Sequence, residues 1–159
     1  MIAMKILLAS DHRGQNVRAM ILEYLRTLPE HSVILIDEQL SEDADYTDAA
    51  AKVAQLVSSG EADRGILICG TGIGTCVVAN KFPGVRAAPC HNEVVAELSR
   101  QHNDANVLCL SGDLLGERSS VAVVAIWLSA EFEGGRHSVR LEKIRQLELE
   151  NTRKSGGGR

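Results

Sequence analysis

Short, continuous apolar runs alternate along this chain with longer stretches in which apolar residues recur at helical spacing. The runs cover residues 5–9 (KILLA), 33–37 (VILID), 65–69 (GILIC), 85–89 (VRAAP) and 106–110 (NVLCL). They are continuous rather than alternating, as expected of strands that are covered on both faces. The pattern therefore predicts five buried strands of a parallel sheet.

The segments between these runs are predicted helices. The face of the first is marked by Val17, Met20, Ile21, Tyr24, Leu25 and Leu28. The next three are expected at residues 47–59, 74–82 and 92–101, with Thr47 and Asn92 as candidate N-caps. A very apolar helix at 119–132 and, after an EGG break, a charged one at 137–150 complete the pattern.

This alternation predicts an α/β fold, with a Rossmann-like parallel five-stranded sheet, helices on both faces and a C-terminal helical arm. Right-handed crossovers follow from the parallel arrangement. We expect residues 1–150 to form a single domain and residues 151–159 (NTRKSGGGR) to be a flexible tail.

Composition narrows the function classes. The 159 residues are 45% hydrophobic but only 3% aromatic, and the net charge is −4, which gives no support for nucleic-acid binding. No apolar stretch approaches the ~20 residues of a membrane span, and the N-terminus lacks the layout of a signal peptide. The four cysteines show no CxxC spacing. We therefore expect reduced thiols and a cytoplasmic location.

The polar residues that could carry chemistry follow the predicted strands. Because ligands of parallel α/β sheets bind at the carboxyl ends of the strands, these residues should share one rim. They are Ser10-Asp11-His12, Asp37-Glu38, Cys69-Gly70-Thr71-Gly72, Cys90-His91 and Ser111-Gly112.

The glycine-rich segment after Cys69 does not fit a nucleotide site. Its glycines are Gly70, Gly72 and Gly74, so GxGxxG fails at Thr75, no acid ends the next strand, and no GK[ST] follows. A loop that exposes backbone N–H groups at a helix start can instead stabilise an anion. Cys69 at its edge could be a buried strand cysteine, or a thiolate that attacks a carbonyl or removes a carbon-bound proton.

Five segments resemble ribose-5-phosphate isomerase type B. They are ASDHRG (9–14), DYTDAA (45–50), ILICGTGIGTCVVANKFPGVRAA (66–88), LSRQHNDANVL (98–108) and EFEGGRHSVRLEKI (131–144). The resemblance spans residues 4 to about 148. It implies an enzyme of the pentose phosphate pathway that interconverts ribose 5-phosphate and ribulose 5-phosphate without a cofactor or metal. It also implies a homodimer or a tetramer of dimers.

The same resemblance assigns roles to individual residues. Cys69 would be the base, and Thr71 with the amides from Gly70 to Gly74 would hold the enediolate oxygens. His102 would open the sugar ring, although it could instead cap a helix end. The resemblance implies sugar contacts for Asn103, Asp11, Asp45 and Tyr46; Asp11 could alternatively cap the first helix, and Tyr46 could be simple packing.

The phosphate is expected to bind to Arg136 and Arg140, which share a helix face if the sixth helix begins there, with His12 as a further candidate. A solvated charged face is the alternative reading of this spacing. By the resemblance, the C-terminal arm and the His102 region would complete the site of a partner subunit.

One position departs from the family pattern. Asp113 lies in the turn after the fifth strand, where the family often has an arginine near the phosphate. An acid there would repel phosphate unless it points away, and Arg13 could compensate. This leaves room for an isomerase of a six-carbon aldose phosphate. A non-catalytic sugar-phosphate binding protein is a separate alternative, against which Cys69, His102 and the glycine loop argue.

Overall fold

The structure is a computed structural model of the chain, and it describes residues 2–36 and 43–156. The strands are β1 (Lys5–Ser10), β2 (Ser32–Leu35), β3 (Arg64–Cys69), β4 (Ala87–Pro89) and β5 (Val107–Ser111). A 3₁₀ turn, η1 (His12–Gly14), precedes α1 (Gln15–Arg26). The other helices are α2 (Tyr46–Ser58), α3 (Ile73–Ala79), α4 (Glu93–Asn103), α5 (Glu117–Ser129) and α6 (Arg136–Gly156).

The strands form one sheet in the order β2-β1-β3-β5-β4, and every pairing is parallel. The predicted α/β class and five-stranded parallel sheet are confirmed. The chain moves from β1 outward to β2 and then returns to add β3 on the other side of β1. Such a reversal opens a crevice at the carboxyl ends of β1 and β3, where ligands of open α/β sheets bind.

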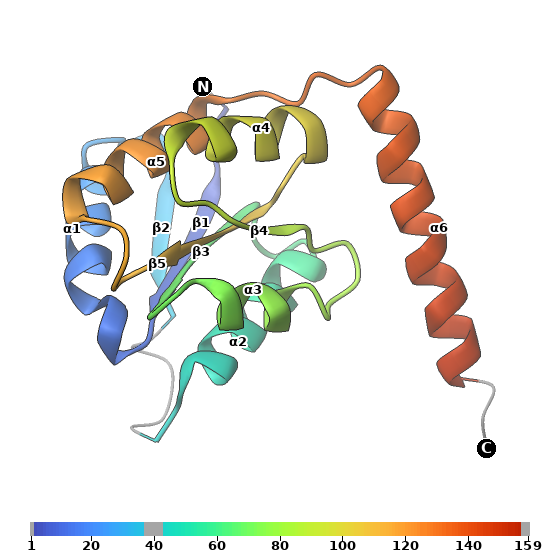
Figure 1. Cartoon of the computed structure of the whole chain (residues 1–159), viewed down its shortest axis with the longest axis horizontal. Coiled ribbons are helices and arrows are strands. Elements are labelled where there is room, and N and C mark those ends of the chain that lie inside the picture. The colour runs from blue at the N-terminus through green and yellow to red at the C-terminus, as the bar shows by residue number, and fades with distance from the viewer. Residues whose placement is uncertain (1, 37–42, 157–159) are drawn as a thin grey trace.

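Both faces of the sheet are covered, which explains why the strands read as continuous apolar runs. Alternate strand residues face opposite sides. In β3, Ile66 and Ile68 pack with α1, α4 and α5, whereas Leu67 packs with α2 and α3. Trp127 of α5 is fully buried on the first side. Figure 1 shows the two helical layers with the sheet between them.

The helix ends differ from the sequence prediction, most of them by one to three residues, and the cap of α2 and the end of α6 need an explanation. Asp45, not Thr47, caps α2: its carboxylate accepts the Thr47 N–H, and the Asp48 side chain accepts the Asp45 N–H in return. Asn92 caps α4 as predicted. The sixth helix continues through Gly156, although the sequence predicted an end at residue 150. Residues 151–155 contain no glycine or proline. The backbone hydrogen bonds of the helix therefore continue through this segment, although it has no apolar residues to pack against the body.

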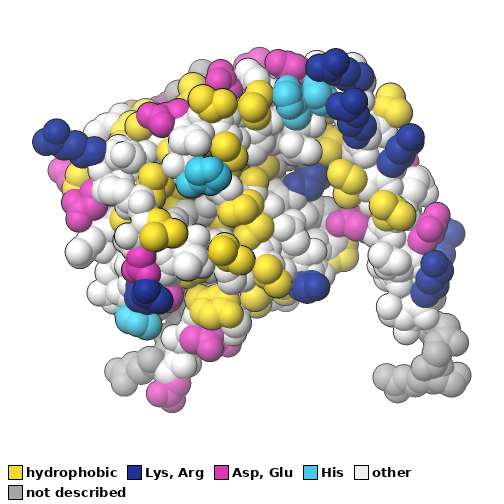
Figure 2. Space-filling model, viewed as in Figure 1, with side chains coloured by type: hydrophobic (Ala, Val, Ile, Leu, Met, Phe, Trp, Pro, Cys, Tyr) yellow, Lys and Arg dark blue, Asp and Glu magenta, His cyan; other side chains and the backbone are white. Residues whose placement is uncertain are grey.

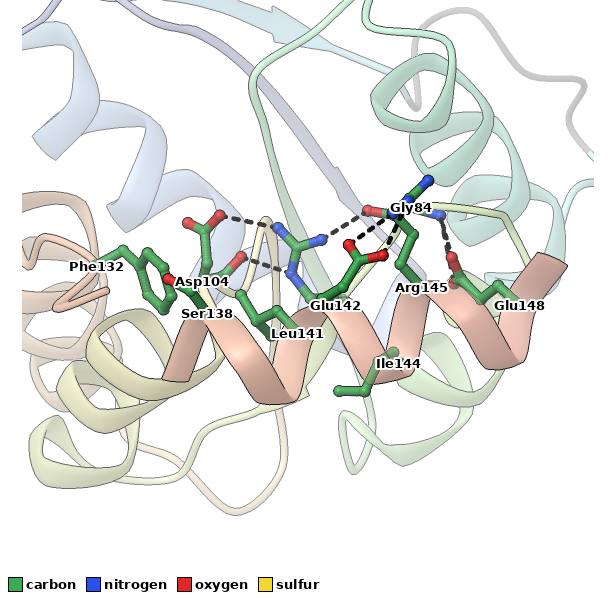
Figure 3. A pocket seen from close by; sticks show the side chains of 10 residues that line it. Gly84, Asp104, Phe132, Ser138, Leu141, Glu142, Ile144, Arg145 and Glu148 are labelled. Carbon is green, nitrogen blue, oxygen red and sulfur yellow. Dashed lines mark hydrogen bonds and ion pairs between the residues drawn. The ribbon is translucent and has the colours of Figure 1, made fainter. Parts of the chain in front are cut away.

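The helix α6 stands apart from the two layers, as an arm joined to α5 by an extended segment (Figure 1). Glu148 connects the arm to the body, because its carboxylate accepts the Gly84 N–H at 3.1 Å. A pocket of about 320 Å³ lies between them, and Figure 3 shows Leu141, Glu142 and Arg145 of α6 along it. Among residues 2–36 and 43–156, no helix combines the length and apolarity needed to cross a bilayer.

Candidate active site

The Cys69 thiol lies at the end of β3 and faces the loop that begins α3. It is buried, with 5% of the residue exposed. The Gly72 N–H donates to its sulfur at 3.2 Å, and the Thr75 hydroxyl lies 3.6 Å from the sulfur. The Thr75 hydroxyl also donates to the Gly72 carbonyl at 3.3 Å, so the turn is tied to the helix that follows it. The thiol is therefore held by the glycine loop and not only by strand packing.

Gly72 is required at its position by both conformation and space. Its φ is +77°, in the left-handed region that favours glycine. A Cβ there would lie 3.0 Å from the carbonyl carbon of Leu110, which is backbone and cannot rotate away. Glycine lets the loop pass this close to β5 while its N–H reaches the sulfur.

Thr71 is exposed beside this turn. Its hydroxyl oxygen accepts the Ile73 N–H at 3.3 Å, and its own hydrogen remains available to a ligand. The amides of Gly72 and Ile73 therefore already have partners in this structure. An oxyanion at the loop would have to share these donors or use the Thr71 hydroxyl and the other amides of the run Gly70–Gly74.

The loops after β3 and β5 are hydrogen-bonded to each other. The Gly112 N–H donates to the Cys69 carbonyl at 2.8 Å, and the Asp113 N–H donates to the Gly70 carbonyl at 3.1 Å. The Ser111 hydroxyl donates to the same Gly70 carbonyl at 2.6 Å. These bonds fix the first residues of the glycine loop against the neighbouring strand end.

The turn after β1 supplies the next group of residues. Asp11 caps η1, because its carboxylate accepts the N–H groups of Arg13 and Gly14 at 2.9 and 3.1 Å. The sequence left capping of the first helix as an alternative, but the carboxylate caps the 3₁₀ turn that precedes α1, whose own N-cap is Gly14. His12 follows at the same rim. The Arg13 guanidinium forms an ion pair with Asp113, which lies in the turn after β5. Asp113 therefore has a cation partner from within the chain.

Tyr46 and Asp45 lie at the start of α2. The Tyr46 ring packs on the glycine loop: a Cβ on Gly74 would come within 2.6 Å of it. The exposed Asp45 carboxylate accepts hydrogen bonds from the Thr47 side chain and backbone, and these bonds lower its pKa. Tyr46 thus belongs to the surroundings of the loop, whereas Asp45 shows a capping role.

A second group of predicted residues gathers where α4 ends and α6 begins. The rings of His102 and His137 are stacked, with centroids 4.2 Å apart and planes 7° apart. Arg136 donates through Nε to Nε2 of His137 at 3.5 Å. Burial lowers the pKa of His137, and the nearby His102, Arg136 and Arg140 lower it further. Figure 2 shows histidine and Lys/Arg side chains together at this place.

The second group also contains a possible metal-binding set. One ligand atom each from His102, Glu133 and His137 lies within 4.8 Å of the other two, a donor set that suits a divalent transition metal. The Arg136 guanidinium beside His137 opposes a cation electrostatically. The same Arg136 and Arg140 stand in the first turns of α6, four residues apart, as the sequence required for a shared face.

The predicted site residues therefore form two groups, and within the described chain no hydrogen bond, ion pair or ring contact joins them. One group surrounds Cys69 at the strand ends, and the other surrounds His102 at the base of the arm. Asn103 belongs to the second group as the last residue of α4. The predicted Asp37-Glu38 pair lies outside the described residues.

A pocket of about 310 Å³ opens at the rim over β3, β4 and β5. Its lining includes the loop residue Thr71 and His91, both exposed, together with the buried Cys90. Of the residues that the sequence placed at the strand ends, Thr71, Cys90, His91 and Ser111 meet there.

The other three thiols differ in their ionisation. A hydrogen bond with the Cys109 thiol lowers the pKa of Cys76 to about 7, and the Asn80 amide adds to this effect. Burial raises the pKa of Cys90 to about 11 and that of Cys109 well above its usual value. Of these three, only the half-buried Cys76 combines partial exposure with a pKa near neutral.

Comparisons with known proteins show the family of this chain. The ribose/galactose isomerase family model matches residues 6–144. Ribose-5-phosphate isomerase B of Escherichia coli is 44% identical over 146 residues, which cover 91% of this chain and 96% of that protein. The chain belongs to the ribose/galactose isomerase family.

Solved structures of this isomerase family have the same fold. Ribose-5-phosphate isomerase B of Clostridium thermocellum aligns with a TM-score of 0.87 and 46% identity, covering 93% of this chain and 99% of that one. The enzyme of Mycoplasma genitalium with bound ribulose-5-phosphate aligns with a TM-score of 0.86 and 42% identity, covering 94% and 99%. The family membership predicted from sequence is confirmed.

Several side chains of this family member were not found from sequence. His137 and Glu133 lie within the EFEGGRHSVRLEKI motif, but nothing local indicates that the His137 ring stacks on His102. Thr75 was considered only as the position at which GxGxxG fails, whereas its hydroxyl lies 3.6 Å from the Cys69 sulfur. Tertiary proximity, not spacing, identifies each of them.

The pKa differences predict an order of thiol reactivity. Because the thiolate is the nucleophile, iodoacetamide at neutral pH should alkylate Cys76 before Cys90 and Cys109. The Cys76 rate should rise with pH and level off above about 7, since the thiol is then ionised. Peptide mass spectrometry across a pH series measures this. Asn80→Ala, which removes one donor to the sulfur, should move the Cys76 profile to higher pH. Faster labelling of Cys90 than of Cys76 would contradict the assignment.

Proposed function

We propose that this chain interconverts ribose 5-phosphate and ribulose 5-phosphate through an enediolate, with Cys69 as the base. The observation that carries the proposal is the Cys69 thiol, held at the strand end by the Gly72 N–H in a chain of this family. The names of the two isomerases B above support the five-carbon substrate.

The reaction moves one proton between two adjacent carbons. The Cys69 thiolate removes the proton from C2 of the open-chain aldose, and the electron pair forms the C1–C2 double bond of the enediolate. The thiol then returns the proton to C1, while a proton passes from O2 to O1, which gives the ketose. Donors at the loop stabilise the negative charge that develops on the oxygens. The Thr71 hydroxyl, with its hydrogen still available, is the side chain best placed for this.

Ring opening must precede this step for the cyclic aldose. We assign it to His102, since an imidazole can exchange a proton with the ring oxygen near neutral pH. The stacked His137 ring restricts the orientation of the His102 ring. Asn103, exposed at the end of α4, would bind the sugar hydroxyls.

The phosphate would bind to Arg136 and Arg140, with His12 contributing from the turn after β1. Two guanidinium groups one helical turn apart can together contact a dianion, and both are exposed. In one chain, however, these arginines lie with His102 and not with Cys69.

A second copy of the chain would bring the two groups together. The arm carries exposed apolar side chains, with Val139 60% and Leu147 59% exposed. The body exposes further ones on α3 and α4, among them Ile73 and Val94 at 61% and 64%. A homodimer, or a tetramer of dimers, that buries these surfaces could place His102, Arg136 and Arg140 of one subunit over Cys69 of the other.

A six-carbon aldose phosphate is the second candidate substrate, because the family description includes galactose as well as ribose. A coupled isomerase assay across pentose and hexose phosphates separates the two. A sugar-phosphate binding protein without activity is the third possibility, and hydrogen isotope exchange at C2 of the sugar separates it from an enzyme.

Replacement of Cys69 tests the chemistry. Cys69→Ala should lower kcat on ribose 5-phosphate at least about a hundredfold, which is the lower end of the usual contribution of a general base. Substrate binding and the unfolding transition should stay close to those of the wild type. Cys90→Ala is the matched control and should retain activity. Near-normal turnover by Cys69→Ala would remove the cysteine from the mechanism.

Replacement of His102 tests ring opening. His102→Asn should slow the reaction from ribose 5-phosphate more than the reaction from ribulose 5-phosphate. Ribulose 5-phosphate cannot close a furanose ring, because its O5 carries the phosphate. Initial rates in both directions provide the comparison. Equal losses in the two directions would exclude His102 from ring opening.

Mixing the two variants, with turnover measured from ribose 5-phosphate, tests whether the site is shared. In a Cys69→Ala and His102→Asn heterodimer, one site carries both substitutions and the other carries neither. Random exchange of equal amounts should therefore restore about a quarter of wild-type activity in a dimer. The variants are mixed, partly unfolded, refolded together and assayed, with each variant alone as control. Failure to recover activity in mixtures that do form heterodimers would place both residues in one subunit's site.

A further inference from the structure

Asp113 holds one edge of the Arg13 guanidinium at the rim. Arg13 Nε donates to Oδ1 of Asp113 at 3.3 Å, and its Nη2 donates to Oδ2. The two side chains come from turns at the ends of β1 and β5. A carboxylate bound in this way uses two of the five donors of a guanidinium and fixes the plane of the others.

The guanidinium also lies over the glycine loop. A Cβ on Gly70 would come within 2.8 Å of both Cζ and Nη1 of Arg13, so a side chain there would displace the guanidinium. Among the residues that the structure describes, Nη1 has no hydrogen-bond partner. The Arg13 side chain is 54% exposed. The structure therefore presents oriented cationic donors beside the first residue of the glycine loop.

The guanidinium and the thiol occupy opposite sides of the chain at the end of β3. Successive side chains in a strand alternate in direction. Cys69 follows Ile68 and points as Leu67 does, toward α3, where its sulfur lies near Thr75. A Cβ on Gly70 would point to the other side, where Arg13 lies. If C1 and C2 of a sugar phosphate lie at the thiol, the Arg13 guanidinium is placed for the other end of that substrate, which carries the phosphate.

We propose that Arg13 contacts the phosphate of the substrate and that Asp113 is the positioning residue for its guanidinium. The inference rests on the proposed function to the extent that the substrate is a sugar phosphate. It reverses the expectation for Asp113, because an acid that would repel phosphate alone instead orients a cation toward it. Arg13 then adds to Arg136 and Arg140, and it comes from the subunit that supplies Cys69.

Two inhibitors that differ only in the phosphate test this assignment. One is a phosphorylated five-carbon aldonic acid, and the other is the same acid without phosphate. Their binding to the full-length wild type and to Arg13→Gln, Arg13→Lys and Asp113→Asn is measured by calorimetry, beside turnover of ribose 5-phosphate. Arg26→Gln, an exposed arginine at the opposite end of α1, is the control.

The phosphorylated acid should bind about ten- to a hundredfold more weakly to Arg13→Gln, the usual effect of losing a charge-assisted contact. The acid without phosphate should bind as it does to the wild type. Arg13→Lys should lose less, since it keeps the charge without the fork. Asp113→Asn should also weaken binding of the phosphorylated acid. If Asp113 only repelled phosphate, Asp113→Asn would bind the phosphorylated acid more tightly than the wild type. That result would overturn the positioning role of Asp113.

Unchanged binding of the phosphorylated acid by Arg13→Gln overturns the inference. So does an equal loss for both acids, because a merely structural ion pair would produce it. If Arg13→Gln does not fold, Arg13→Lys decides by the same comparison. The wild type could fail to isomerise ribose 5-phosphate while Arg13→Gln still loses the preference for the phosphorylated acid. That result would refute the proposed substrate and leave the phosphate contact of Arg13 standing.

Discussion

The pairing of β3 with β5 is the constraint on which the site depends. Their parallel register continues past the strands, where the amides of Gly112 and Asp113 donate to the carbonyls of Cys69 and Gly70. These bonds set the position of the glycine loop. They also bring Asp113 to the place where it meets Arg13. The thiol, the loop and the cation are consequently held by one set of backbone contacts between two central strands.

The sequence predicted the framework well, because its signals are local. Five continuous apolar runs correspond to the five strands, of which β1, β3 and β5 are buried while the edge strands β2 and β4 are only partly buried. Asn92 caps α4 as its spacing indicated. The start of α2 was harder, because DADYTD offers several capping side chains. Asp45 is preferred since Asp48, three residues on, can return its hydrogen bond. The end of α6 was missed because a helix can continue on backbone bonds alone in a polar segment.

The contacts within the site could not be predicted in the same way. Arg13 and Asp113 are 100 positions apart, so Asp113 viewed alone suggested repulsion of phosphate. The His102–His137 stack likewise joins the end of one helix to the start of another. Motif resemblance named most members of the two groups. It did not indicate that they would form two separate groups in one chain.

The close approach of Gly72 to the backbone of Leu110 has an evolutionary consequence. Any side chain at Gly72 would collide with a strand and would also have to adopt a left-handed conformation. The loop that holds the thiol is thus closed to gradual variation. A change of substrate would then have to come from the surrounding turns. Under the proposed function, this separation would keep the proton-transfer group fixed while the choice of substrate changes.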